Sequence, residues 1–293
     1  MYIGFNEATT MKCSTLALDV QLCEQVGFHA IELRLDMIHS YLRNHSKHSL
    51  LDLFEGRKIR PVNINAIYTY ETLFSDQDNQ YRQTSFLNEF QYACELASFI
   101  GGNALVVCPP LKPDRISSFQ LSEDELIDMN VRILSQLAKI AKATETELWF
   151  EIIGAEYSSC RTIVQAKKIL ERVFEKNLKL TLDSYNLYMG NPVGWLNDLL
   201  LLTEKDIGIA HINDADDVPL EQLGPQSARK FCGDGILNLS GYLGLLKTLG
   251  YDGVVSIETF RPEYWEKPAH WVVHEAYRST RKAMEKAHCF MSD

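Results

Sequence analysis

Four apolar runs in this sequence end at a side chain that could bind a metal ion or move a proton. A single Asp after such a run is common where a strand turns into a helix, because its side chain can accept backbone hydrogen bonds there. The same ending repeated four times favours a shared site instead. The runs are Leu148–Glu151, Leu178–Asp183, Ile207–His211 and Val254–Glu258, so the four candidate residues are Glu151, Asp183, His211 and Glu258.

If these side chains converge, the three carboxylates repel one another, and at least one of them is driven to take up a proton. A divalent cation removes that conflict. Oxygen ligands together with one imidazole suit Mn2+, Mg2+, Co2+, Fe2+ or Zn2+. We therefore expect a divalent metal ion and interpret His211 as a ligand. The ligand set does not choose among these ions, and Mn2+ is taken as the first choice. Cys108 also ends an apolar run, but we interpret it as a small apolar filler.

Short apolar runs alternate along the chain with longer amphipathic ones, which is the pattern of βα units. The eight expected strands cover residues 3–5, 30–33, 59–66, 104–108, 147–153, 178–183, 207–212 and 253–259. The expected helices cover about 14–27, 50–54, 81–99, 122–140, 162–174, 192–202, 239–249 and 268–293. A polar, His-rich connection is expected after residue 33, and a long polar one between 213 and 238.

Eight such units fit one (β/α)8 TIM-barrel domain over residues 1–293 better than two doubly wound domains. No Ser/Gly-rich linker divides the chain, and no Gly-x-Gly-x-x-Gly follows the first expected strand. In a TIM barrel the site lies at the carboxyl ends of the strands, where the side chains face one shared mouth. The expected fold would therefore bring the four strand ends together.

Composition limits the partners of this protein. A formal net charge of -10 repels phosphate backbones, so we expect no nucleic-acid partner. No segment approaches the roughly 20 apolar residues of a membrane helix, and the first residues do not resemble a signal peptide, so we expect a cytoplasmic protein without a membrane partner. The seven cysteines contain no CxxC pair, which argues against a disulfide framework. The last helix could pack on the barrel or on a second subunit of a homo-oligomer.

Several motifs carry a resemblance that spans nearly the whole chain. They are Phe5–Thr10, Leu182–Ser184, His211–Asp214 and Ser256–Tyr264. With them the chain resembles the xylose isomerase-like barrels, which include sugar isomerases, keto-sugar epimerases, inosose-converting enzymes and AP endonucleases. Within that superfamily it is most similar to the 2-keto-myo-inositol (inosose) isomerases. The resemblance implies one divalent metal on Glu151, Asp183, His211 and Glu258, and a small keto-polyol or keto-sugar as substrate.

Similarity to keto-sugar epimerases further implies that Glu151 and Glu258 carry the proton as well as the metal. Moving a ketone to the neighbouring carbon requires removal of the C–H proton beside the carbonyl and its return one carbon over. A metal at the carbonyl and the adjacent hydroxyl would stabilise the enediolate. Carboxylates beside the substrate could shuttle the proton.

Four further residues are weaker candidates for substrate contacts. Asn65 and Asn186 lie at or just beyond expected strand ends, where an Asn can equally serve the backbone. Arg261 follows Glu258 closely and could bind substrate or anchor a loop. Arg229 lies in the long connection, where Cys232–Gly235 could form a lid.

Four functions compete on these features. The first is an isomerase acting on a keto-inositol, with a keto-sugar 3-epimerase as its close alternative. The second is an inosose dehydratase, which needs a general acid over the leaving hydroxyl. The third, an AP endonuclease, needs a three-metal cluster with more histidines, whereas this chain has Asn65, Cys108 and Asn186 at the corresponding places. The fourth is a non-catalytic binding barrel, which an intact metal quartet disfavours.

Overall fold

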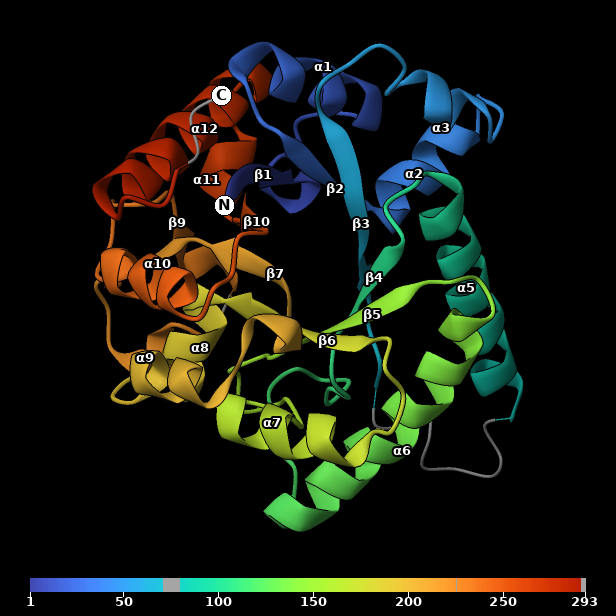
Figure 1. Cartoon of the computed structure of the whole chain (residues 1–293), viewed down its shortest axis with the longest axis vertical. Helices are drawn as coiled ribbons and strands as arrows, with labels where there is room; N and C mark the ends of the chain where they lie inside the picture. Colours follow the sequence, from blue (N-terminus) through green and yellow to red (C-terminus); the bar gives the residue numbers. More distant parts are fainter. Residues whose placement is uncertain (71–79, 225, 291–293) are drawn as a thin grey trace.

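The computed structural model describes residues 1–70, 80–224 and 226–290 and shows a closed barrel of parallel strands surrounded by helices (Figure 1). Around the barrel the strands follow the order β1-β10-β7-β6-β5-β4-β3-β2. The predicted (β/α)8 fold class is therefore confirmed. That the whole chain forms one domain stays a prediction.

The barrel strands match the eight expected apolar runs to within two residues at either end. They are β1 Tyr2–Asn6, β2 Ala30–Arg34, β3 Arg60–Ile67, β4 Ala104–Val107, β5 Glu147–Glu151, β6 Leu178–Asp183, β7 Ile207–Ile212 and β10 Val254–Ile257. The long connection after β7 holds a separate two-stranded sheet, β8 Asp214–Ala215 with β9 Arg229–Lys230.

Most of the helices begin and end at the signals that the sequence carries. The Thr15 side chain accepts the Leu18 N–H at the start of α1, and Gly27 ends that helix with a left-handed φ of 102°. Ser122 and Glu125 form a capping box at the start of α6. The α-helices are α1 Leu16–Val26, α2 Leu35–Leu42, α3 Ser49–Asp52, α5 Gln80–Phe99, α6 Glu123–Lys142, α7 Ile163–Arg172, α8 Ser184–Gly190, α9 Trp195–Asp198, α10 Leu239–Thr248, α11 Pro262–Trp265 and α12 Ala269–Lys286.

Among the described residues, three α-helices were not expected: α2, α8 and the short α11. The His-rich connection after β2 contains α2, in which Leu35, Met37 and Ile38 are buried while His39 and Ser40 are exposed. The polar residues made the helical spacing of the apolar ones hard to recognise in the sequence. Helix α8 follows Asp183 without a loop, and the Asp183 carboxylate accepts the Asn186 N–H as its N-cap. The helix expected from residue 192 begins only at Trp195 and continues as a short 3-10 helix, Leu199–Leu201.

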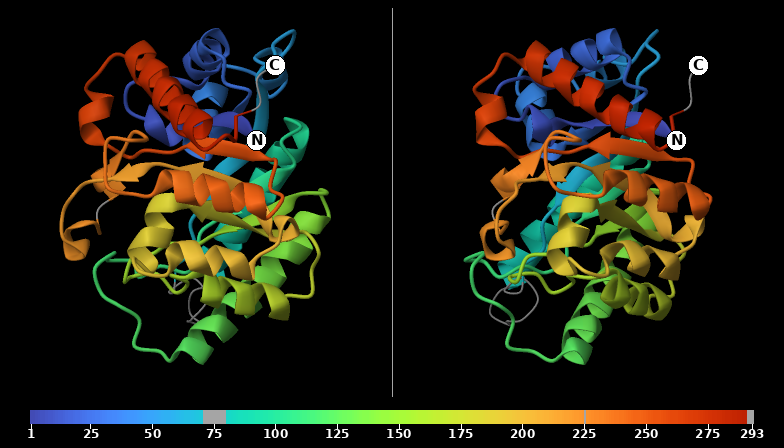
Figure 2. Two further views of the ribbon diagram at one scale, coloured as in Figure 1. Left: turned by 60° about the vertical axis from the view of Figure 1, so that its left-hand side comes forward. Right: turned by 90° about the vertical axis from the view of Figure 1, so that its left-hand side faces the viewer.

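The last helix packs on the barrel of its own chain. Both views in Figure 2 show α12 beside α1, and Tyr277 of α12 meets Phe28 edge to face, with ring centroids 5.2 Å apart. Val272 and Val273 are fully buried. Helix α12 thus closes the ring of helices, although residues 291–293 of the expected helix lie outside the described residues. None of the helices described is long and apolar enough to cross a membrane.

The barrel interior changes from apolar to polar along the strands. Val106, Trp149 and Ile209 form a small buried cluster inside the barrel. Side chains two positions apart on a strand share a face. Cys108, Glu151 and His211 each follow a member of this cluster by two residues, so they lie on the same face and nearer the carboxyl ends of the strands. The barrel interior therefore has an apolar layer, with polar side chains next to it at the carboxyl ends of the strands.

A buried carboxyl pair, Glu7 and Asp19, lies beside β2 and offers a test of the packing. Thr10 Oγ1 donates to Asp19 Oδ2 at 2.9 Å, and the Arg34 N–H donates to Glu7 Oε2 at 2.7 Å. Burial raises the pKa of Asp19 to about 7, and burial together with Asp19 raises the pKa of Glu7.

Because Asp19 binds its proton more tightly in the folded chain, its contribution to stability is present at low pH and is lost as the pH rises from about 4 to about 7. Asp19→Asn cannot ionise, so its free energy of unfolding should not show this loss. We therefore expect the difference in free energy of unfolding, variant minus wild type, to be about 2 kcal/mol more favourable at about pH 8 than at about pH 5. Urea titrations at the two pH values measure it. Asp52→Asn, at an exposed carboxyl, is the control; parallel pH profiles for wild type and Asp19→Asn would contradict the assignment.

Candidate metal centre

The structure brings the four predicted strand-end residues together. One ligand atom from each of Glu151, Asp183, His211 and Glu258 lies within 4.8 Å of all the others, and all four residues are buried. Glu151 and Asp183 end β5 and β6, His211 lies near the end of β7, and Glu258 follows β10. The register pairs Asp183 directly with His211, whereas Glu258 lies two residues beyond Ser256, the partner of His211.

His211 presents one nitrogen to the carboxylates and one to a different partner. Its Nε2 lies 3.0 Å from Glu32 Oε2, whereas its Nδ1 lies 3.3 Å from Glu258 Oε2 and 3.9 Å from Glu151 Oε1. Within the described part of the chain, this buried Nδ1 has no hydrogen-bond partner. Burial lowers the pKa of His211, but Glu32 and Glu258 raise it well above its ordinary value. A divalent cation fits between such a nitrogen and three carboxylates.

Asparagine side chains hold the three carboxylates from outside the cluster. Each carboxylate accepts at least one amide N–H, which restricts its rotation and leaves other lone pairs for a ligand. The pairs are Asn186 to Glu151 at 3.2 Å, Asn213 to Asp183 at 2.7 Å, and Asn6 and Asn65 to Glu258 at 3.1 and 2.9 Å. Two of the weaker sequence candidates, Asn65 and Asn186, thus contact the cluster directly.

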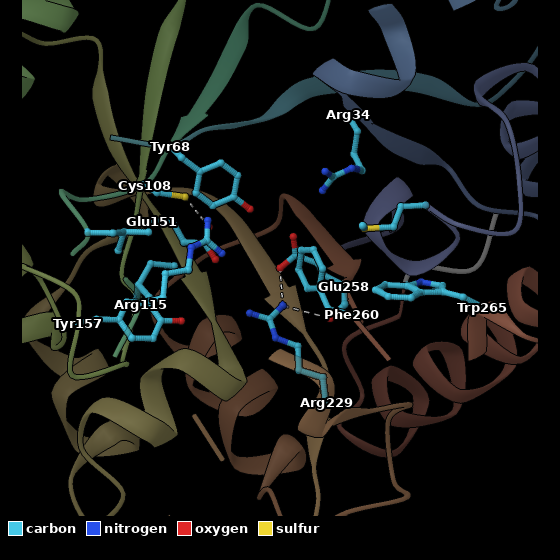
Figure 3. Close-up of a pocket in the computed structure, with 13 residues that line it drawn as sticks. Arg34, Tyr68, Cys108, Arg115, Glu151, Tyr157, Arg229, Glu258, Phe260 and Trp265 are labelled. Atoms are coloured by element: carbon cyan, nitrogen blue, oxygen red, sulfur yellow. Dashed lines mark hydrogen bonds and ion pairs between the residues drawn. The ribbon is translucent and has the colours of Figure 1, made fainter. Parts of the chain in front are cut away.

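Arg229 is the buried cation of this site. It extends from β9, is 1% exposed, and places one guanidinium nitrogen 2.5 Å from Glu258 Oε2 and 3.4 Å from Asp183 Oδ2. Tyr185 and Phe260 stack against the guanidinium at 5.3 and 5.2 Å from their ring centroids. Figure 3 shows the guanidinium of Arg229 pointing at the Glu258 carboxylate.

The buried carboxyls divide into proton-holding and ionised groups. Burial, followed by the charge of Glu258, raises the pKa of Glu151 to about 8. Burial also raises the pKa of Asp183, against the opposing charge of Arg229. For Glu258 burial is outweighed by His211 and Arg229, which hold its pKa below the ordinary value. Without a bound cation, these shifts favour a proton on Glu151 and an ionised Glu258.

A cavity of about 370 Å³ opens above the cluster, with Glu151 and Glu258 in its floor (Figure 3). Its wall combines aromatic rings with cationic side chains, which suits a small polar ring whose C–H faces can lie against aromatic groups. Tyr68, Tyr157, Phe260, Trp265, Arg34 and Arg115 contribute to this wall. Cys108 is buried in the apolar core, as expected of a small filler, and it also lines this cavity, with Sγ 3.7 Å from Glu151 Oε2.

The remaining sequence candidates lie outside the cavity wall. Arg261 donates to Asp216 Oδ2 at 2.9 Å and to the Arg229 carbonyl at 3.3 Å, which favours the loop-anchoring role. Gly233–Gly235 line a separate surface cavity against α12 instead of the mouth.

The sequence reasoning missed the residues that support the cluster from behind. Asn6, Glu32 and Asn213 are fully buried and hydrogen-bond the cluster, but they were passed over as parts of strands or loops. A usable signal existed for Glu32, which is a charged residue inside the apolar run 30–33.

The chain is similar to known proteins over nearly its whole length. The family model described as "Xylose isomerase-like TIM barrel" matches residues 20–283. Proteins named inosose isomerase from Bacillus velezensis and Bacillus subtilis are each 31% identical to the chain, over 98% of it and 98% and 99% of their own lengths. A crystal structure of the IolI protein with a bound zinc atom matches with a TM-score of 0.88 and 29% identity, covering all of both chains.

Proposed function

This chain belongs to the xylose isomerase-like TIM-barrel family, and on that premise we propose that it is a metal-dependent isomerase that moves the ketone of a keto-inositol to the adjacent carbon through an enediolate. The observation that carries the proposal is the buried quartet Glu151, Asp183, His211 and Glu258 under a sugar-sized cavity. The full-length similarity to proteins named inosose isomerase supports the choice of substrate.

The quartet would hold one divalent ion. His211 Nδ1 faces the carboxylates and makes no hydrogen bond to any residue that the structure describes, which supports this assignment. When bound, the ion supplies positive charge that stabilises the enediolate as it forms. The zinc atom in the IolI structure makes Zn2+ as good a candidate as the Mn2+ expected first, and three carboxylates with one imidazole accept both.

Glu258 and Glu151 would divide the proton transfer between them. Glu258, ionised beside His211 and Arg229, takes the C–H proton from the carbon that bears the hydroxyl. The electron pair of that bond forms the enediolate while the hydroxyl proton passes to the former carbonyl oxygen. Glu151 then delivers a proton to the former carbonyl carbon, which leaves Glu258 protonated and Glu151 ionised. The ketone has then moved by one carbon. Both residues are thus ligand and proton carrier at once.

Other polar groups would position the substrate. Arg229 and Asn186 are buried beside the cluster, and Asn186 Oδ1 has no hydrogen-bond partner among the described residues, so it is available to a substrate hydroxyl. Asn65 would act through Glu258. We further propose a role in inositol catabolism in the cytoplasm, with a small keto-polyol and no nucleic acid as partner; a homo-oligomer stays a prediction.

The test is to incubate the protein, loaded with Zn2+ or Mn2+, with a panel of keto-inositols and ketohexoses and to follow products by NMR. We expect a ketone shifted by one carbon in a keto-inositol, and loss of this conversion after a chelator removes the metal. An inverted centre beside an unmoved ketone would instead establish the 3-epimerase, and a product lacking one water would establish the dehydratase.

A further inference from the structure

We propose that Glu32 is a positioning residue that decides which nitrogen of His211 binds the metal. It holds Nε2 as a hydrogen-bond donor and leaves Nδ1 for the ion. This inference rests on the proposed metal site and adds an atomic assignment to it. Among the described residues, Glu32 does not line the cavity and makes no direct hydrogen bond to the three carboxylate ligands. It contacts His211 directly, and it meets Glu258 only through Asn6, which donates to both carboxylates.

Glu32 reaches His211 across the inside of the barrel. It projects from β2, while His211 lies on β7, and β1 and β10 stand between these strands. Both side chains are fully buried, and Glu32 Oε2 lies 3.0 Å from His211 Nε2. Since water is excluded from this layer, the contact is worth more than the same pair would be on the surface.

The other partners of Glu32 show that it acts as an acceptor. Asn6 donates to Oε1 at 3.1 Å and Asn63 donates to Oε2 at 2.9 Å. The orientation of the Asn6 amide is fixed, because its oxygen accepts the Ala8 N–H at 2.9 Å and its nitrogen must therefore face Glu32. With both oxygens accepting, the hydrogen of the His211 contact belongs to Nε2.

His211 Nδ1 is then the only ring nitrogen that can offer a lone pair to a metal. It faces Glu258 Oε2 at 3.3 Å and Glu151 Oε1 at 3.9 Å, which is the space enclosed by the quartet. A carboxylate that fixes the tautomer and direction of a ligating histidine typically contributes 10–100-fold to metal affinity. Glu32 should have an effect of that size.

The first experiment measures Zn2+ affinity by competition with a chromophoric chelator. Glu32→Gln replaces one acceptor oxygen with an NH2 group, which would face an N–H donor of a neighbouring side chain instead of accepting from it. We expect the variant to bind Zn2+ roughly 10–100-fold more weakly than wild type. Glu32→Asp keeps the charge but shortens the reach, so it should bind with intermediate affinity. The control is Glu7→Gln, since Glu7 is equally buried and accepts its hydrogen bond from the Arg34 backbone. Equal affinities in Glu32→Gln and Glu7→Gln would overturn the inference.

The second experiment needs neither a variant nor a substrate. Wild-type protein with isotope-labelled histidine is loaded with Cd2+, and NMR coupling to the metal identifies the bound nitrogen. We expect coupling to Nδ1 of His211 and a proton on Nε2. Coupling to Nε2 would overturn the inference while leaving the metal site intact, whereas a wild-type protein that bound no ion would overturn the proposed function and the inference together. If Glu32→Gln fails to fold, the wild-type spectrum still decides.

Discussion

Glu258→Gln is expected to lower the rate of solvent-deuterium exchange into a bound keto-inositol by roughly a thousandfold. The amide cannot take the C–H proton, and it is a weaker metal ligand than the carboxylate that accepts from Asn65 and Arg229 in the wild type. The measurement is the loss of the substrate C–H signal in heavy water, with the metal content of the variant determined in parallel. An unchanged exchange rate would exclude Glu258 as the base.

Two further variants sharpen this prediction. Glu151→Gln should stop conversion while retaining more exchange than Glu258→Gln, because the enediolate can still form when only the delivering acid is lost. Glu263→Gln, five residues beyond Glu258 on an exposed position, should leave both rates unchanged. Equal exchange in the Glu151 and Glu258 variants would contradict the division of roles.

Arg229→Met is expected to destabilise the metal-free protein by about 3–5 kcal/mol. Arg229 is a buried cation that lies against Glu258 and Asp183, and without it these carboxylates keep only the compensating charge of His211. A bound divalent ion would replace that charge, so Zn2+ should stabilise the variant by more than it stabilises wild type. Urea unfolding with and without Zn2+ measures all four free energies.

The matched control lies next to Arg229 on the same short strand. Lys230 is half-buried and pairs with Asp216 at 3.3 Å, so Lys230→Met should cost less than about 1 kcal/mol and respond to Zn2+ as wild type does. If Zn2+ stabilised Arg229→Met no more than wild type, the guanidinium and the ion would not be sharing the same carboxylates.

The strand ends were predictable because a buried parallel strand that closes on a charged group is visible in the sequence. Leu178–Asp183 shows this directly, and the barrel topology then forces four such ends into one mouth. Helix starts at Thr15 and Ser122 were predictable for a similar reason, since the capping signal is local.

The supporting residues were not predictable, because their roles depend on contacts across the barrel. Glu32 meets His211 over a separation of 179 residues, and no local pattern relates them. Asn186 was weighed as a substrate contact or a backbone residue, but its amide also orients Glu151, 35 residues earlier. Helix α2 was missed because its exposed His39 and Ser40 resemble a loop when their buried neighbours are unknown.

The account depends most directly on one divalent ion bound by the four strand-end side chains. Anomalous diffraction from crystals grown with Zn2+ tests this. We expect one fully occupied peak at about 2.0–2.2 Å from an oxygen of each of Glu151, Asp183 and Glu258 and from His211 Nδ1. A peak elsewhere in the chain, with none inside this quartet, would contradict the account.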